Sequence, residues 1–99
     1  MEFKVLYEKV VQNALNYGKK FDVAIDGEFS HMKLIEEVGE FSQALLIYKR
    51  KSRPEKFLPE AEAKEEVAKE LADVVGMAFV NAHVLGIDME AAMAKWINK

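Results

Sequence analysis

The sequence has 99 residues, of which 51% are hydrophobic and 31% charged; this is typical of one folded domain and excludes a disordered chain. The formal net charge is −3, so there is no overall basic field to attract nucleic acid. The chain has no cysteine, which excludes disulfides, thiolate chemistry and zinc sites built on cysteine.

The N-terminal segment has charges among its apolar residues and lacks the apolar core of a secretory signal. The longest apolar stretch, Val74 to Leu85, is too short to span a bilayer and contains Asn81 and His83. We therefore expect a cytoplasmic protein that binds neither membranes nor nucleic acid.

The first half of the chain predicts two helices, because its apolar residues recur with a period of 3.6 residues. The first helix is expected from about Glu2 to Lys19, with Gly18 at its C-terminal end. The second is expected over about 29–50, and either Asp26 or Ser30 is suited to cap it.

The second half begins with a clear break over Ser52–Pro59, where two prolines stand among alternating charges. A third helix is expected over Glu60–Leu85, ended by Gly86. Asp88 then caps a fourth helix that reaches Lys99.

From Val74 onward the third helix is apolar nearly all round, which predicts burial on every side. A chain with so few helices cannot cover such a segment alone, so we expect a second subunit to help. The prediction is therefore an all-α fold: a single domain over residues 1–99, folded as a short bundle of about four helices and assembled as a homodimer or homotetramer.

Two acidic pairs are the main functional signal. Glu37 and Glu40 lie three residues apart in the second helix, and Glu70 and Asp73 have the same spacing in the third. On a helix this spacing places both carboxylates on nearly one face. Two such helices packed together would aim four carboxylates at one point, where a hard cation such as Mg²⁺ would relieve their repulsion. The plain alternative is surface pairing with lysines, and one such pair alone is a weak signal.

On the third helix, the acidic residues lie on the same face as the apolar residues that follow them. Asp73 is therefore expected at the edge of the core. Glu66 lies one turn before Glu70 and is a reserve ligand. Glu36 is expected to point away from Glu37 and to be the least suited to share a metal ion with it.

Three segments in order resemble the all-α nucleoside triphosphate pyrophosphohydrolase superfamily, specifically its MazG-like branch. The family pattern is a Glu-Glu-x-x-Glu helix, then Glu-x-x-Asp, then a turn of the Gly-Ile-Asp-Leu type. The matching segments are Glu36-Glu37-x-x-Glu40, Glu70-x-x-Asp73 and Gly86-Ile87-Asp88-Met89, and the resemblance covers roughly Met32 to Ala94.

The resemblance implies hydrolysis of nucleoside or deoxynucleoside triphosphates at the α-phosphorus, giving the monophosphate and pyrophosphate. It implies Mg²⁺, with Mn²⁺ as a substitute, held by Glu37, Glu40, Glu70 and Asp73, which are then both the metal ligands and the catalytic residues. Glu37 is our choice for the residue that orients or deprotonates the attacking water.

Members of the family often close with a lysine and an asparagine about one turn apart, followed by an arginine and a tyrosine. Lys95 and Asn98 approximate the first pair and are therefore expected to bind substrate, and the sequence ends at Lys99 before the second. The connection between Glu40 and Glu70 is somewhat long for the family.

A pocket for base and sugar is expected between the first helix and the connection that follows it. Tyr17, Phe21 and Phe29 are available there for stacking, although such aromatic residues more often belong to the core. Asn81 lies on the same line of the third helix as Glu70, so it is predicted to contact base or ribose; the alternative is a buried amide with its hydrogen bonds satisfied.

Other functions share parts of this pattern. Phosphoribosyl-ATP pyrophosphohydrolase and dimeric dUTPase belong to the same superfamily and carry the same acidic scaffold. From a different class, the chain could be a non-catalytic helical module that binds a metal ion or a partner protein. A module that only binds a partner should neither need Mg²⁺ nor be stabilised by it.

Overall fold

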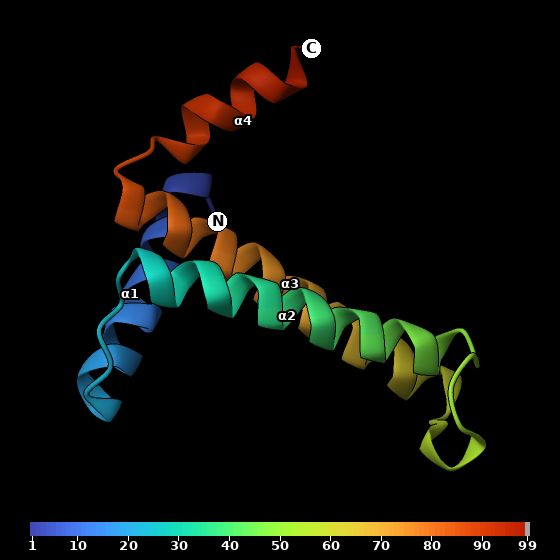
Figure 1. Ribbon diagram of the computed structural model, residues 1–99. Helices are drawn as coiled ribbons and strands as arrows, with labels where there is room; N and C mark the ends of the chain where they lie inside the picture. The colour runs from blue at the N-terminus through green and yellow to red at the C-terminus, as the bar shows by residue number, and fades with distance from the viewer. Residues whose placement is uncertain (99) are drawn as a thin grey trace.

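The computed structural model describes residues 1–98, and within them the fold is all-α with no strand (Figure 1). This confirms the predicted fold class. The elements, in chain order, are α1 (Phe3–Phe21), α2 (Gly27–Tyr48), the short 3₁₀ helix η1 (Pro54–Lys56), α3 (Glu60–Leu85) and α4 (Met89–Ile97).

Two long helices form the body of the molecule. Helices α2 and α3 lie side by side and antiparallel along most of their length, and the connection that contains η1 joins them at one end (Figure 1). Helix α1 packs on α3 near the other end of this pair, and α4 leaves the end of α3 at a steep angle. None of the described helices alone has the length and apolarity to cross a membrane; α3 and α4 pass that test only together, with a bend of 118° between them.

The ends of the helices follow from local hydrogen bonding. Asp26 caps α2, since its Oδ1 accepts a hydrogen bond of 2.9 Å from the backbone N–H of Phe29. Asp88 caps α4 through a bond of 3.0 Å from the N–H of Ala91. Gly86 ends α3 in the left-handed conformation, with φ of 69°, as the sequence predicted. The predicted last residue of the fourth helix, Lys99, lies outside the described residues.

Gly18 has a different role from the predicted one. Helix α1 continues past it to Phe21, and Asp22 takes the left-handed cap position with φ of 54°. A Cβ at position 18 would lie 2.7 Å from both the carbonyl oxygen of Val23 and a side-chain carbon of Ile25. Glycine is therefore needed so that the connection can fold back closely against α1.

The core of the single chain is small. Phe79 is buried on α3, with the rings of Phe3 and Tyr7 from α1 at centroid distances of 5.5 and 5.3 Å. The buried apolar residues among those described are Val11, Ala63, Phe79, Val80 and Ala82.

The single chain leaves apolar side chains exposed on both α2 and α3. Val38 of α2 is 43% exposed, because the face toward α3 is centred on Ser30 and Glu37. The end of α3 is not buried on every side: Val75 and Leu85 are 46% and 68% exposed. One side of α3 therefore lacks the cover that its sequence predicts.

Candidate metal centre

The antiparallel pairing of α2 and α3 brings the two acidic pairs together. Carboxylate oxygens of Glu37, Glu70 and Asp73 lie within 4.8 Å of one another, and so do those of Glu36, Glu37 and Glu40. In an octahedral Mg²⁺ site with bonds of about 2.1 Å, opposite ligands are about 4.2 Å apart. Modest adjustment of these side chains would therefore let one ion contact several of them. Glu37 belongs to both groups and lies at the centre of the cluster.

Glu37 is the buried member, with 8% of its surface exposed. Its Oε2 is buried and has no hydrogen-bond partner. The pKa of Glu37 is raised to about 7, mainly by burial and in addition by the nearby charges of Glu40 and Asp73. A buried carboxylate without a partner is costly, and a bound cation would supply one.

Glu70 is in a similar position on α3. Its Oε2 is buried without a partner, and burial raises its pKa, with the charges of Glu40 and Asp73 adding to the effect. Thus each helix contributes one carboxylate oxygen that is buried and unsatisfied. Such a pair on facing helices, within reach of other carboxylates, fits a hard divalent cation that takes oxygen ligands.

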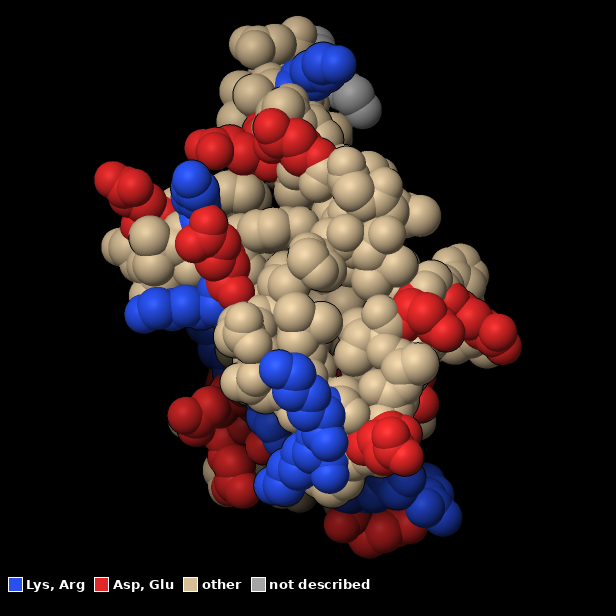
Figure 2. All heavy atoms as spheres, turned by 90° about the vertical axis from the view of Figure 1, so that its left-hand side faces the viewer, with Lys and Arg blue, Asp and Glu red and all other residues tan. Residues whose placement is uncertain are grey.

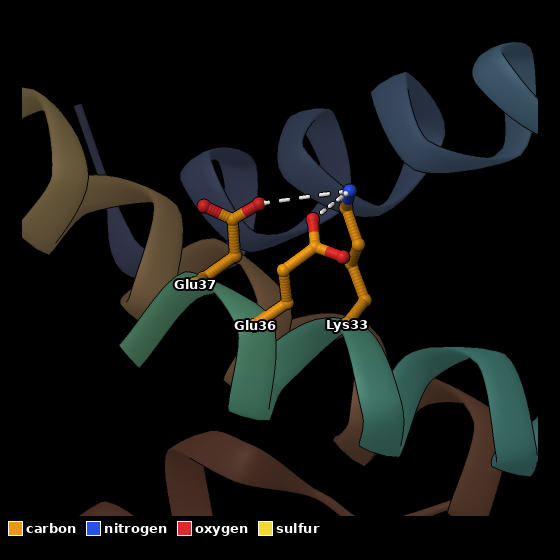
Figure 3. A network of polar contacts seen from close by, with 3 residues as sticks. All are labelled: Lys33, Glu36 and Glu37. Atoms are coloured by element: carbon orange, nitrogen blue, oxygen red, sulfur yellow. Dashed lines mark hydrogen bonds and ion pairs between the residues drawn. The ribbon is translucent and has the colours of Figure 1, made fainter. Parts of the chain in front are cut away.

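Lys33 provides positive charge at the edge of the cluster. Its Nζ lies 2.7 Å from Oε1 of Glu36 and 3.9 Å from Oε1 of Glu37 (Figure 3). The hydrogen bond to Glu36 raises the pKa of Lys33. The expectation that Glu36 points away from Glu37 was wrong: the two side chains rise from the same side of α2 and both approach Lys33.

A pocket of about 590 Å³ opens beside the carboxylates, between α1 and the α2–α3 pair. Glu37 and Asp73 line one part of it, and the aromatic side chains of Tyr17 and Phe29 line another, with their ring centroids 6.3 Å apart. Phe21 is not among the lining residues and packs on Tyr17 instead. The pocket joins a mostly apolar wall to an acidic end, which is the usual character of a small-molecule site.

The lining also includes polar residues that the sequence analysis missed. Lys9 and Asn13 face the pocket from α1, eight and four residues before Tyr17, and Lys33 faces it from α2. The i, i+4 spacing of Lys33 and Glu37 was visible in the sequence as a surface ion pair. Nothing in the sequence shows that α1 crosses above them to enclose a pocket.

Asn81 holds α3 to α2. Its Nδ2 donates to the carbonyl oxygens of Ser30, at 2.8 Å, and Met77, at 2.7 Å. It does not line the pocket that contains Glu37. The geometry therefore favours the buried amide, which the sequence left open, over contact with base or ribose.

Three other predicted residues lie away from the pocket. Glu66 is exposed and shares a second hollow, of about 480 Å³, with Glu40 and Glu70 on the other side of the cluster. Lys95 and Asn98 are exposed at the C-terminal end of α4 and do not line the pocket beside Glu37. Their predicted contact with substrate stays a prediction.

The comparison with known families agrees with this geometry. The family model of the MazG nucleotide pyrophosphohydrolase domain matches residues 28–99, which include both acidic pairs and the turn at Gly86. No curated protein and no solved structure matches the chain significantly. The match covers well over half of the chain, and the protein therefore belongs to the MazG nucleotide pyrophosphohydrolase family.

Proposed function

We propose that the protein hydrolyses nucleoside or deoxynucleoside triphosphates at the α-phosphorus, releasing the monophosphate and pyrophosphate, with Mg²⁺ held by Glu37, Glu40, Glu70 and Asp73. Mn²⁺ would substitute for Mg²⁺, since it accepts the same oxygen ligands. The observation that carries the proposal is the clustering of these carboxylates, two of them with buried unpartnered oxygens, next to a pocket with aromatic walls that Glu37 and Asp73 line.

A divalent cation would remove the main electrostatic obstacle to this substrate. A triphosphate is a polyanion, which four carboxylates would repel. Bound among them, the cation would neutralise their charge and polarise the phosphate oxygens. Glu37 and Glu70 fit this role best, because their unpartnered oxygens are already removed from water.

The protein's own contribution is to position water and accept a proton. We assign Glu37 to the attacking water, since its carboxylate is buried at the centre of the cluster and lines the pocket. The water oxygen bonds to the α-phosphorus, and the bond from this phosphorus to the α,β-bridging oxygen breaks. The proton of the water passes to Glu37, and pyrophosphate leaves with the bridging oxygen.

The nucleoside would occupy the part of the pocket away from the carboxylates. Tyr17 and Phe29 offer faces on which a base can stack, and Asn13 offers an amide that can pair with a polar edge. The pocket volume of about 590 Å³ lies in the range of small-molecule sites.

We also propose that the chain works as a homodimer or homotetramer. The described chain exposes 7433 Å², whereas a compact monomer of 11.3 kDa exposes about 5,700 Å². The excess is larger than the roughly 800 Å² that each partner buries in a standard interface. One face of the molecule has a broad area without charged side chains (Figure 2). Large exposed apolar side chains occur on several helices, including Met32, Ile35 and Leu46 of α2 and Leu71 and Val75 of α3.

We therefore expect sedimentation equilibrium at micromolar concentration to give a mass of at least twice 11.3 kDa. Ile35→Glu, which places a charge in the exposed apolar side of α2, should shift the mass toward the monomer. Exposed Glu65→Lys is a control that should leave it unchanged. A wild-type mass of one chain under these conditions would contradict the proposed assembly.

Product analysis tests the proposed reaction. A panel of the common NTPs and dNTPs, with Mg²⁺ or with EDTA, should give monophosphate and pyrophosphate from at least one nucleotide, and only with the metal. Asp73→Ala should lower this rate by about 100-fold or more, because it removes one of the ligand carboxylates. Glu65→Ala, an exposed acid on the same helix, should retain the activity.

Turnover that survives in Asp73→Ala would contradict the assignment of this carboxylate. Release of orthophosphate instead of pyrophosphate would mean that a different bond breaks. A folded protein that binds Mg²⁺ and turns over none of these nucleotides would favour the metal-binding module.

A further inference from the structure

Three side chains on α2 follow one another along the wall of the pocket. Phe29, Lys33 and Glu37 are spaced four residues apart, and all three line the same cavity. Successive members of such a row are about 6 Å apart along the helix axis, at a rise of 1.5 Å per residue. The row thus presents an aromatic ring, then a cation, then a carboxylate, in fixed order.

Lys33 has a special place in this row. It is the only lysine or arginine among the described residues that forms an ion pair within the acidic cluster, with Nζ 3.9 Å from Oε1 of Glu37. Its other contact, at 2.7 Å, is to Glu36, which is largely exposed. The ammonium group therefore lies where the pocket meets the carboxylates, and a partly exposed ion pair holds it there only weakly.

The order of the row matches the order of groups in a nucleotide. In a nucleoside triphosphate, sugar and then α-phosphate follow the base, and the α-phosphate is the group attacked in the proposed reaction. A base stacked at Phe29 with its α-phosphorus near Glu37 would bring α-phosphate oxygens past Lys33. There the α-phosphate would lie between this ammonium group and a cation bound at the carboxylates.

We propose that Lys33 is a substrate-positioning residue that binds the α-phosphate and sets its distance from the stacked base, so that the α-phosphorus, rather than the β or γ, faces Glu37. This inference rests on the proposed pyrophosphohydrolase function. The inference assigns Lys33 to the nucleotide side of the bond that breaks. The contact between Lys33 and the α-phosphate should therefore persist in the monophosphate product, and free pyrophosphate should not make it.

A second consequence concerns the metal ion. In the metal-free protein the positive charge of Lys33 lies close to Glu37, where it opposes binding of a cation to the same carboxylate. Removing that charge should strengthen Mg²⁺ binding while it weakens nucleotide binding. A residue needed only for folding would weaken both, so the opposite signs separate the two roles.

The test compares the wild type with Lys33→Met, Lys33→Gln and Lys33→Arg, using Lys64→Met, an exposed lysine on α3, as the matched control. Calorimetry would measure binding of Mg²⁺ alone, and then of each common nucleoside monophosphate, the corresponding nucleoside and inorganic pyrophosphate with saturating Mg²⁺. Circular dichroism and thermal melting show which variants are folded.

The expected result is that the wild type binds at least one monophosphate more tightly than its nucleoside. In Lys33→Met and Lys33→Gln the Kd for that monophosphate should rise about tenfold or more, because one charge-assisted hydrogen bond is lost. The Kd for the nucleoside and for pyrophosphate should stay within about twofold, and the Kd for Mg²⁺ should fall. Lys33→Arg should restore most of the monophosphate affinity, and Lys64→Met should match the wild type.

This inference alone would be overturned if a folded Lys33→Gln variant bound the monophosphate as tightly as the wild type did, while the wild type still turned over nucleotides. A larger loss for pyrophosphate than for the monophosphate would also overturn it, because Lys33 would then bind the leaving group. A wild type that turns over no nucleotide and binds no monophosphate would overturn the proposed function together with the inference.

Discussion

Glu37→Gln is expected to lower the rate of pyrophosphate release by about 10³-fold while making the metal-free protein more stable. Glutamine keeps the size of the side chain, but it cannot accept the proton of the attacking water and is a weaker cation ligand. In the metal-free fold it removes a carboxylate that is buried next to Glu40 and Asp73 with one oxygen unpartnered. Steady-state kinetics with Mg²⁺ measure the first effect. Thermal melting in EDTA at pH 8 measures the second.

Exposed Glu65→Gln, on α3, is the control for the first experiment and should change neither quantity. The two effects are expected to have opposite signs, because the same carboxylate is costly for the metal-free fold and is the proposed proton acceptor of the reaction. A Glu37→Gln protein that keeps its activity would remove Glu37 from the reaction. One that is inactive and much less stable would indicate a structural role.

The second large effect is a loss of stability with rising pH in the absence of metal. The pKa of Glu37 is raised from an ordinary value of 4.5 to about 7, so the folded chain binds this proton more tightly than the unfolded chain. The stability from this proton is fully present below about pH 4.5 and is lost as pH rises through 7. We expect the free energy of unfolding in EDTA to fall by about 2–3 kcal/mol between pH 5 and pH 8 because of this group.

Comparison of the wild type with Glu37→Gln reports the contribution of Glu37 together with its coupling to Glu40 and Asp73, since the titrating groups outside the cluster are common to both. Urea unfolding at several pH values in EDTA should show the steeper fall in the wild type. Mg²⁺ at about 100 times its Kd should restore about 2.7 kcal/mol at pH 8 and less at pH 5, where the proton competes with the metal. Parallel pH profiles for the two proteins, with no response to Mg²⁺, would contradict the account of the cluster.

The helices were predictable from the sequence because their end signals are local. The bounds of α3 follow from Pro59 and Gly86, and Asp26 and Asp88 cap the helices that follow them. The end of α1 was not predictable in the same way: Gly18 is needed for the close approach of Val23 and Ile25, which is a contact between segments. Helix spacing alone cannot distinguish a glycine that ends a helix from one that a neighbouring segment requires.

The acidic cluster was predictable in part. Spacing of three residues on two helices places Glu37 near Glu40 and Glu70 near Asp73, and antiparallel packing then brings the pairs together. The burial of Glu37 was not predictable, because it depends on how α2 is rotated about its axis against α3.

The pocket was the least predictable part of the candidate site. The approach of α1 creates it and places Lys9 and Asn13 opposite Lys33. No periodicity within one helix reports such a crossing. For the same reason Asn81, which shares a line with Glu70 on α3, could not be assigned from the sequence: its bond to Ser30 depends on the register between helices.

The most direct test of the central claim is hydrolysis of the preferred nucleotide with Mg²⁺ in water enriched in ¹⁸O. Attack at the α-phosphorus breaks the bond to the bridging oxygen and places the solvent oxygen on the monophosphate. Mass spectrometry of the products should therefore find one ¹⁸O in the monophosphate and none in the pyrophosphate. Label in pyrophosphate or orthophosphate, with an unlabelled nucleotide product, would contradict attack at the α-phosphorus.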